Sequence, residues 1–286
     1  MAIKLVAVDL DGTLLTGKKT ITENTVRAVA RAARHGIEVA FSTGRDYGEF
    51  ASMLRTLPDI HYAVACTGAS VIDCRSGREL CLDPLGPGEL RLAWETLRGF
   101  DLIFEVFLGG KIYAEAEKVA NIGYYLAATH NPPPRGSRTP VENFGGWLAS
   151  LDRPATKIHM YFRDHDERDR AWDAAKALPL SVCTSDDYDL EVMARHVDKG
   201  AGLRRLAEYL RLDRREILAV GDSLNDLGML EYAGQSAVMG NGLTELKEKA
   251  DIIADTNERD GVAKLLDALS SGELETGAAG RKNTVQ

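Results

Sequence analysis

The sequence is poor in the residues that build disulfide-stapled proteins and zinc-thiolate sites. Its 286 residues include four cysteines and six histidines. Cys66, Cys74, Cys81 and Cys183 form no C-x-x-C pair, and no histidine stands at zinc-finger spacing from them. Each cysteine lies in or beside an apolar segment. We therefore expect reduced thiols, most of them buried, and no zinc finger.

Long apolar runs and an excess of positive charge are also missing. No stretch reaches 18 consecutive apolar residues, and no basic segment precedes an apolar one at the N-terminus. The formal net charge is −8, whereas a nonspecific nucleic-acid surface needs clustered lysine and arginine to neutralise phosphates. These features predict a soluble, cytoplasmic monomer or homodimer with neither a nucleic-acid nor a membrane partner.

What the chain does contain is an alternation of short apolar runs and helical patterns. With 44% hydrophobic residues it can bury a large core, in one large domain or two unequal ones. Helical periodicity separates several of the apolar runs, so we expect parallel strands covered on both faces, the doubly wound α/β fold. The expected strands are residues 4–10, 37–42, 61–67, 216–222, 235–240 and 250–255.

The middle of the chain has a different rhythm. From about residue 83 it predicts a helix, a strand pair turning at Gly109 and Gly110, a helix, a proline-rich loop, a strand, a helix and two further strands. This order is typical of an antiparallel α+β domain inserted into the parallel one. The predicted organisation is a core at 1–82 and 191–270, an inserted cap at 83–190, and a disordered tail at 271–286 that lacks periodicity.

Polar residues that end strands carry the functional interest, because ligands of open parallel sheets bind at the carboxyl ends of strands. Asp9 and Asp11 end the first apolar run, and Gly12 and Thr13 follow at once. The other positions are Thr43 in "STGR", the segment "GDSLND" with Asp222, Asn225 and Asp226, and Lys199 at the start of a helix.

Two carboxylates at the mouth of a buried strand repel each other, which a divalent cation would offset. Mg²⁺ prefers oxygen ligands and keeps several waters, so two or three carboxyl or carbonyl groups suffice to hold it. One aspartate is then available to attack phosphorus and the next but one to move protons. The residues therefore predict a site for Mg²⁺ and a phosphate.

The motifs "DLDGT", "STGR", "DKGAGL" and "GDSLNDLGML" resemble, in this order, the four motifs of the haloacid dehalogenase superfamily of phosphatases. The continuation from "AVMGNG" onward is similar to the Cof-type hydrolases, which have a large α/β cap between the second and third motifs. The resemblance covers almost the whole expected fold, although the cap matches in layout more than in residues. Thr67 stands where many relatives have asparagine.

The resemblance implies a Mg²⁺-dependent phosphatase of small phosphorylated metabolites. In it Asp9 is the nucleophile that forms an aspartyl-phosphate, and Asp11 is the general acid and then the base. Thr43, Gly44, Lys199 and Asn225 contact the phosphoryl group, and Lys199 pairs with Asp9. The metal ligands are Asp9, the backbone carbonyl of Asp11 and Asp222, and Asp226 orients the metal's surroundings.

Two other functions stay open at this point. A phosphomutase keeps both early aspartates, but it should need several cap arginines to hold a distal phosphate; the candidates are Arg135, Arg138, Arg153 and Arg163. A non-catalytic metal or phosphate-binding module is the second alternative. Asp11 argues against such a module, because a protein that keeps its acyl-phosphate gains nothing from a proton-transfer group beside it.

Overall fold

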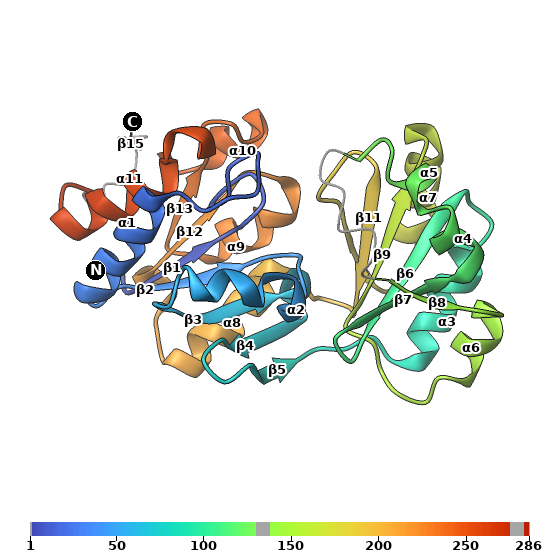
Figure 1. The fold of residues 1–286 in the computed structure, drawn as a ribbon. Coiled ribbons are helices and arrows are strands. Elements are labelled where there is room, and N and C mark those ends of the chain that lie inside the picture. The colour runs from blue at the N-terminus through green and yellow to red at the C-terminus, as the bar shows by residue number, and fades with distance from the viewer. Residues whose placement is uncertain (1, 130–137, 275–282, 286) are drawn as a thin grey trace. The chain divides into compact units, whose positions relative to one another are not determined.

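A computed structural model describes residues 2–129, 138–274 and 283–285. The chain divides into two compact units (Figure 1). The first, called the core unit here, comprises residues 1–81 and 198–286, and the second, the inserted unit, comprises residues 82–197. Within the described residues no helix is long and apolar enough to cross a bilayer.

The core unit is built on a nine-stranded sheet in the order β15-β14-β13-β12-β1-β2-β3-β4-β5. Figure 1 shows β1 between β12 and β2, both of which pair with it in parallel. Strand β4 runs antiparallel to its neighbour β3. The strands are β1 (Leu5–Val8), β2 (Glu38–Ser42), β3 (Ile60–Ala65), β4 (Ser70–Asp73), β5 (Arg78–Leu82), β12 (Ile217–Gly221), β13 (Gln235–Val238), β14 (Ile252–Ile253) and β15 (Asn283–Thr284).

Helices cover both faces of this sheet. They are α1 (Glu23–Arg34), α2 (Tyr47–Phe50), α8 (Lys199–Leu210), α9 (Leu227–Tyr232), α10 (Thr244–Lys249) and α11 (Gly261–Ser271). Val6 and Val8 of β1 pack in one apolar cluster with α1 and α11, and Leu5 and Ala7 pack in another with α8 and α9. This alternation explains why the strand is apolar at every position, as the doubly wound prediction requires. Figure 1 shows α1 and α11 side by side.

The N-terminus of α1 is fixed by the side chain of Thr22. The Thr22 side chain accepts a hydrogen bond from the Thr25 backbone N–H, and its hydroxyl donates to Asp260 Oδ1 at 2.6 Å. Asp260 immediately precedes α11. The same threonine therefore begins one helix and ties it to the start of its neighbour.

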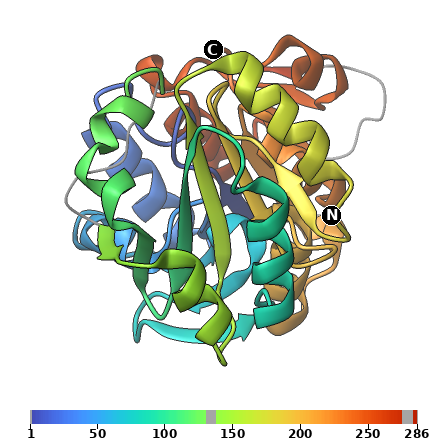
Figure 2. The ribbon, with the colours of Figure 1, turned by 90° about the vertical axis from the view of Figure 1, so that its right-hand side faces the viewer.

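The inserted unit has a six-stranded sheet in the order β10-β11-β9-β6-β7-β8. Figure 2 shows α3 (teal) and α7 (yellow-green) lying over one face of this sheet, and side chains from both helices join the apolar cluster on that face. Its strands are β6 (Leu102–Leu108), β7 (Lys111–Glu115), β8 (Arg138–Val141), β9 (Lys157–Phe162), β10 (Ser181–Cys183) and β11 (Asp189–Met193). Its helices are α3 (Pro87–Leu97), α4 (Ala116–Ala120), α5 (Ile122–Tyr125), α6 (Phe144–Ser150) and α7 (His165–Lys176).

The return from the inserted unit lies later than the sequence predicted. Strand β11 pairs with both β9 and β10, so residues 191–193 belong to the inserted sheet and the core resumes at Asp198. Part of the tail predicted to be disordered is ordered: α11 continues to Ser271, and β15 pairs in parallel with β14. Residues 275–282 and 286 of that tail lie outside the described residues, as does most of the proline-rich loop.

Candidate active site

The predicted residues gather at the carboxyl ends of the central core strands. Asp9 follows β1 directly, Thr43 follows β2, and Asp222 follows β12. Since β12, β1 and β2 are adjacent and parallel, these three side chains start from one edge of the sheet. On one side of β1 the successive strands are β2 and β3, and on the other side they are β12, β13 and β14, so the strand order reverses direction at β1. This is the switch point at which open α/β sheets bind their ligands.

Lys199 reaches this edge from the first position of α8. It is fully buried, and its Nζ donates to Asp9 Oδ1 at 2.7 Å and to Asp226 Oδ1 at 2.6 Å. Asp198 caps the helix by accepting from the Ala201 backbone N–H, which fixes where Lys199 emerges. The predicted pairing of Lys199 with Asp9 is present, and the second pairing, with Asp226, was not foreseen.

Asp226 holds the loop that follows β12. Its Oδ2 accepts hydrogen bonds from the backbone N–H groups of Asp222, at 2.9 Å, and Ser223, at 3.1 Å, while its Oδ1 accepts from Lys199. Both oxygens are thus engaged by the protein. We conclude that Asp226 acts mainly by positioning Asp222 and Lys199.

The loop after β1 packs directly against the carboxylate of Asp222. Gly12 has φ +86°, and a Cβ there would lie 2.3 Å from Asp222 Oδ2, so any other residue would collide with that carboxylate. The Thr13 hydroxyl donates to Asp222 Oδ1 at 2.8 Å. Thr13 therefore orients Asp222, a role that the sequence did not suggest.

Burial and mutual repulsion disfavour the ionised carboxylates here. Burial raises the pKa of Asp9 well above its ordinary range; Lys199 acts to lower it, and the nearby carboxylates of Asp226, Asp222 and Asp11 raise it further. Burial, followed by the charge of Asp226, raises the pKa of Asp222 to about 7. Burial alone would lower the pKa of Lys199, but Asp226 and Asp9 raise it. The cluster is short of positive charge.

This donor set suits a divalent cation. Carboxylate oxygens of Asp9, Asp222 and Asp226 lie within 4.8 Å of one another, and oxygen ligands of this kind suit Mg²⁺. A bound cation would also stabilise the ionised forms that burial and repulsion oppose. Because Asp226 already uses both oxygens, Asp9 and Asp222 are the side chains best able to bind it.

Asp11 is held by two cationic side chains. Arg45 donates from Nε to Asp11 Oδ2 and from Nη2 to Oδ1, both at 2.8 Å, and Lys19 Nζ donates to Oδ1 at 2.7 Å. Burial alone would raise the pKa of Asp11, but the hydrogen bonds and charges of Arg45 and Lys19 bring it below its ordinary value. Asp11 is therefore a carboxylate here.

Thr43 is buried and braced by a turn of unusual backbone conformation. Cys66, Thr67 and Gly68 all have positive φ, at 50°, 56° and 98°. The Thr67 N–H donates to the Thr43 carbonyl, and the Cys66 N–H donates to that of Arg45, each at 3.0 Å. A left-handed conformation at two non-glycine residues is strained, so this turn persists because the loop around Thr43 requires it.

The sequence thus identified most of the cluster, including Lys199, but not the two cations that hold Asp11. The structure brings together Asp9, Lys199, Asp222 and Asp226 through the contacts above. Asn225 Oδ1 accepts from the Ser223 hydroxyl at 2.9 Å, beside them in the same loop. Arg45 was visible as the last residue of "STGR", where a cation two residues after Thr43 was a usable signal. Lys19 carried no signal in sequence.

A second group of metal-type ligands lies in the inserted unit. His159 Nε2 is 3.1 Å from Asp189 Oδ2 and 3.9 Å from Glu191 Oε1, and all three residues are buried. Lys157 Nζ, 3.0 Å from Glu191 Oε1, already supplies a buried positive charge. We interpret the group as a structural ion network.

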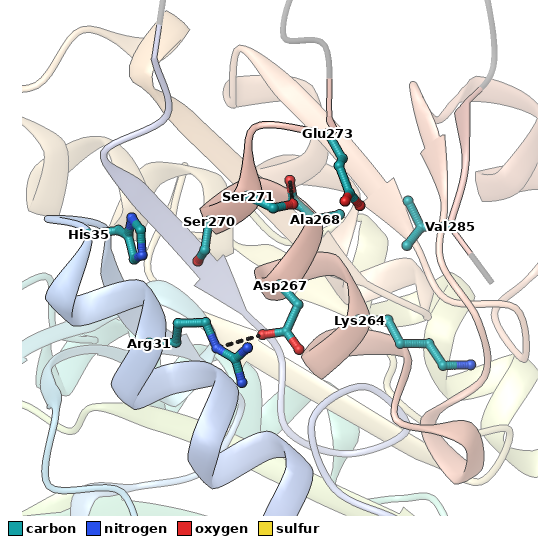
Figure 3. A pocket seen from close by; sticks show the side chains of 9 residues that line it. All are labelled: Arg31, His35, Lys264, Asp267, Ala268, Ser270, Ser271, Glu273 and Val285. Atoms are coloured by element: carbon teal, nitrogen blue, oxygen red, sulfur yellow. Dashed lines mark hydrogen bonds and ion pairs between the residues drawn. The ribbon is translucent and has the colours of Figure 1, made fainter.

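A cavity of about 530 Å³ lies elsewhere on the core unit, between α1 and α11 (Figure 3). Figure 3 shows Arg31 and Asp267 facing each other across it, with Nε and Oδ1 3.3 Å apart. His35, which ends α1, lies at its edge. Helix α1 connects the carboxyl end of β1 to the amino end of the parallel strand β2. Its C-terminal end, with this cavity, therefore lies toward the amino ends of the strands, away from Asp9.

Comparison with known proteins identifies the family. The profile of the haloacid dehalogenase-like hydrolases matches residues 6–266. A putative phosphatase of Streptococcus pyogenes, M6_Spy0533, is 30% identical over 92% of this chain and 97% of its own. The 5-amino-6-(5-phospho-D-ribitylamino)uracil phosphatase YwtE of Bacillus subtilis is 29% identical over 95% of this chain and 99% of its own. A solved haloacid dehalogenase-like hydrolase from B. subtilis has a TM-score of 0.82 at 28% identity, covering 93% of this chain and 99% of that one.

The chain belongs to the haloacid dehalogenase-like hydrolase family. The predicted α/β fold and the predicted class, a hydrolase of phosphoric monoesters, are both confirmed at this level. None of the four cysteines, all in the described part of the chain, forms a disulfide; Cys66 and Cys74 are buried, but Cys81 and Cys183 are only partly buried, so the expectation that most would be buried is not met.

Proposed function

We propose that this protein is a Mg²⁺-dependent phosphatase of small phosphorylated metabolites that works through an aspartyl-phosphate on Asp9. The observation that carries the proposal is the buried contact of Lys199 with Asp9 at the carboxyl end of β1, 2.7 Å long, with Asp222 on the adjacent strand end. Lys199 holds the Asp9 carboxylate in one orientation and places positive charge where phosphoryl oxygens gather during transfer. Asp9 and Asp222 would hold Mg²⁺, which would neutralise charge on those oxygens.

In the first half-reaction, an Asp9 carboxylate oxygen attacks phosphorus and the bond from phosphorus to the leaving-group oxygen breaks. To act as the acid in this step Asp11 must first take up a proton, which Arg45 and Lys19 disfavour in the free protein, and it then gives that proton to the leaving-group oxygen. Thr43, Gly44 and Asn225 are proposed to bind the phosphoryl group. Asp9 then carries the phosphoryl group as an acyl-phosphate, a mixed anhydride.

In the second half-reaction, water attacks the same phosphorus. Asp11 accepts a proton from that water, and the bond from phosphorus to Asp9 breaks. Inorganic phosphate leaves, and Asp9 returns to its starting form. Asp11 ends this step protonated and ready to act as an acid again.

The substrate is proposed to be a small phosphate ester such as a sugar phosphate or a phosphorylated ribityl compound. This part of the proposal rests on relatives, because YwtE is named for a phosphoribitylamino-uracil substrate. The contacts described for Asp9, Lys199, Asp222 and Asp226 join these residues to one another and to their own loops. They suit binding of a phosphoryl group and do not indicate which leaving group it carries.

The mutase alternative is less well supported. It needs arginines free to hold a second phosphate, yet Arg138 makes two hydrogen bonds to Glu105, at 2.7 and 3.0 Å, in a buried pair. The Arg163 guanidinium lies 5.9 Å from the centre of the Tyr124 ring. Arg138 is therefore committed to Glu105, whereas Arg153 and Arg163 are exposed and Arg135 lies outside the described residues.

The test is phosphate release from p-nitrophenyl phosphate and a panel of sugar and nucleotide phosphates, with Mg²⁺ or with EDTA. We expect Mg²⁺-dependent release by the wild type, and a loss of at least about a thousandfold in Asp9→Asn, which removes the nucleophile. Asp11→Asn should lose about a hundredfold or more. A folded wild type that releases phosphate from none of these compounds would overturn the proposal; transfer to a second hydroxyl of the substrate instead would favour the mutase.

A further inference from the structure

The loop after β1 is tied to two asparagines from distant parts of the core unit. Asn241, in the loop after β13, donates from Nδ2 to the Gly12 carbonyl oxygen at 2.8 Å. Asn257, in the turn between β14 and α11, donates from Nδ2 to the Leu15 carbonyl oxygen at 2.9 Å. These contacts join residues that are 229 and 242 positions apart in sequence. Residues that follow β13 and β14 therefore hold the segment that follows β1.

The side-chain amide of Asn241 is oriented from both sides. Its Oδ1 accepts from the Asn257 backbone N–H at 2.9 Å, while its Nδ2 donates to the Gly12 carbonyl. Turning the amide over would place oxygen against oxygen and donor against donor, so the two hydrogen bonds specify one orientation. The neighbouring backbone is held as well, because the Gly240 carbonyl accepts from Lys247 Nζ at 2.8 Å. Asn241 thus presents its donor to Gly12 in a defined direction.

Asp222 lies between the two loops that Asn241 joins. On the side of β1, Gly12 is so close to its carboxylate that a Cβ would lie 2.3 Å from Asp222 Oδ2. On the side of β13, the Leu243 N–H donates to the Asp222 carbonyl at 3.0 Å, and a Cβ on Gly242 would lie 3.1 Å from Asp222 Cα. One loop therefore contacts the carboxylate of Asp222 and the other contacts its backbone. The hydrogen bond from Asn241 to Gly12 sets the spacing between these loops.

Position 12 benefits from such a restraint because it is a glycine. Glycine adopts many backbone conformations at little cost, and Gly12 is held at φ +86°. The next residue, Thr13, donates its hydroxyl to Asp222 Oδ1 at 2.8 Å. A shift of the Gly12 carbonyl would therefore move both Gly12 and the Thr13 hydroxyl relative to the Asp222 carboxylate.

We propose that Asn241 is a positioning residue for the divalent cation and that Asn257 supports it: the Asn241 amide holds Gly12 and Thr13 against Asp222, which keeps the Asp222 carboxylate in the orientation that binds Mg²⁺. The inference rests on the proposed function, in which Asp222 binds that ion. Asn241 acts through Gly12 and Thr13, as the residues behind a metal ligand generally do. Loss of its amide should weaken Mg²⁺ binding more than it slows the reaction of the loaded enzyme.

Thermal unfolding in rising concentrations of Mg²⁺, with protein freed of metal by EDTA and dialysed, measures the binding without any substrate. The stabilisation grows with the ratio of the Mg²⁺ concentration to its dissociation constant, so the series gives that constant. For Asn241→Ala we expect the dissociation constant to increase at least about fivefold, and kcat with p-nitrophenyl phosphate at saturating Mg²⁺ to stay within about threefold of wild type. A purely structural role would lower the melting temperature equally at every Mg²⁺ concentration.

Two further variants sharpen the test. Asn257→Ala retains the backbone N–H that donates to Asn241 but loses the hydrogen bond to Leu15, so we expect a smaller increase in the dissociation constant, of about two- to threefold. This variant decides the matter if Asn241→Ala does not fold. Asn24→Ala is the matched control: Asn24 is also exposed, and its Nδ2 also joins distant segments, through Asp260 Oδ2 at 2.5 Å. Its dissociation constant for Mg²⁺ should equal that of the wild type.

Failure of this inference differs from failure of the proposed function. Wild type that neither gains stability from Mg²⁺ nor releases phosphate contradicts both. Wild type that is stabilised by Mg²⁺ but releases no phosphate contradicts the proposed function, and the melting series then still decides the role of Asn241.

An active wild type whose Asn241→Ala variant has an unchanged dissociation constant for Mg²⁺ overturns this inference alone. An equal increase in Asn24→Ala would do the same. So would a variant whose only change is a higher KM for p-nitrophenyl phosphate, because Asn241 would then act on the substrate.

Discussion

The carboxyl group of Asp222 can either keep its proton or, when ionised, bind the proposed Mg²⁺. Its pKa, raised to about 7 by burial and by Asp226, lies above the value of about 3.9 expected in the unfolded chain. The folded, metal-free protein therefore holds this proton more tightly than the unfolded chain does. The resulting contribution to stability is complete below about pH 4 and is lost as the pH rises toward 7.

Mg²⁺ should reverse that trend, because it displaces the proton. We expect the rise in melting temperature on adding Mg²⁺ to be larger at about pH 8 than at about pH 5.5. When Mg²⁺ exceeds its dissociation constant a hundredfold, the free energy of unfolding should increase by about 2.7 kcal/mol. Thermal unfolding with Mg²⁺ or EDTA at the two pH values measures this. Asp222→Asn should lose most of the effect; an equal rise at both pH values, or an undiminished one in that variant, would contradict it.

At the same scale, the sequence predicted the carboxylates better than the cations. Asp9 and Asp222 follow directly from position, because each comes immediately after a buried parallel strand, whereas Asp226 lies in the turn that follows Asp222. Lys199 was predicted through the family motif. The Lys19 contact depends on how two loops fold together, and no local pattern encodes such a meeting.

Among the secondary-structure elements, the turn Cys66–Gly68 lies very close to the start of α8. A Cβ on Gly68 would lie 1.8 Å from the Asp198 carbonyl oxygen and 3.0 Å from the Lys199 backbone nitrogen, and Gly68 has φ +98°. The bare backbone of Gly68 is what allows this turn, which also braces Thr43, to sit against the first residues of the helix that carries Lys199.

Gly68→Ala should therefore separate the two elements. We expect a loss of about 2 to 4 kcal/mol in the free energy of unfolding, from backbone strain together with overlap of fixed atoms. Urea unfolding measures it. Gly36→Ala is the matched control, since Gly36 has φ +76° but nothing within 4 Å of the added Cβ, and should cost about 1 kcal/mol. Equal losses in the two variants would refute the steric account.

Elements with regular patterns were predicted, and those defined by partners were not. Helix α1 spans Glu23–Arg34, and it is flanked by Thr22 and Gly36, residue types that favour the start and the end of a helix. Strands β4 and β5 were not predicted. They are four and five residues long, and β4 is recognised as a strand through its pairing with β3 rather than through its own sequence pattern. Strand β8 was assigned to the proline-rich loop, yet Arg138–Val141 pairs with β7.

For the whole molecule, the inserted unit is continuous in sequence and the core unit is not. Residues 82–197 contain their own sheet and their own apolar core, in which Phe104, Met160 and Phe162 are buried. A chain of this length can bury enough apolar surface to fold alone. The core unit, by contrast, needs both of its segments, because β1 pairs with β12 across the insertion.

We therefore expect residues 82–197, expressed alone, to fold. All three tryptophans of the chain, Trp94, Trp147 and Trp172, lie in this segment, so their fluorescence reports on it directly. A cooperative urea transition in tryptophan fluorescence, matched by one in far-ultraviolet circular dichroism, is the expected result. A gradual fluorescence change without a transition would show that the segment depends on the core unit. The full chain, followed by the same two probes, is the reference.

The separation of the two units also bears on how such a chain can change over generations. Every contact described above for Asp9, Asp11, Lys199, Asp222 and Asp226 comes from residues of the core unit. Mutations in residues 82–197 can accumulate without altering a partner of the residues proposed to attack phosphorus. The residues around Asp9 can therefore be inherited unchanged while the inserted unit diverges.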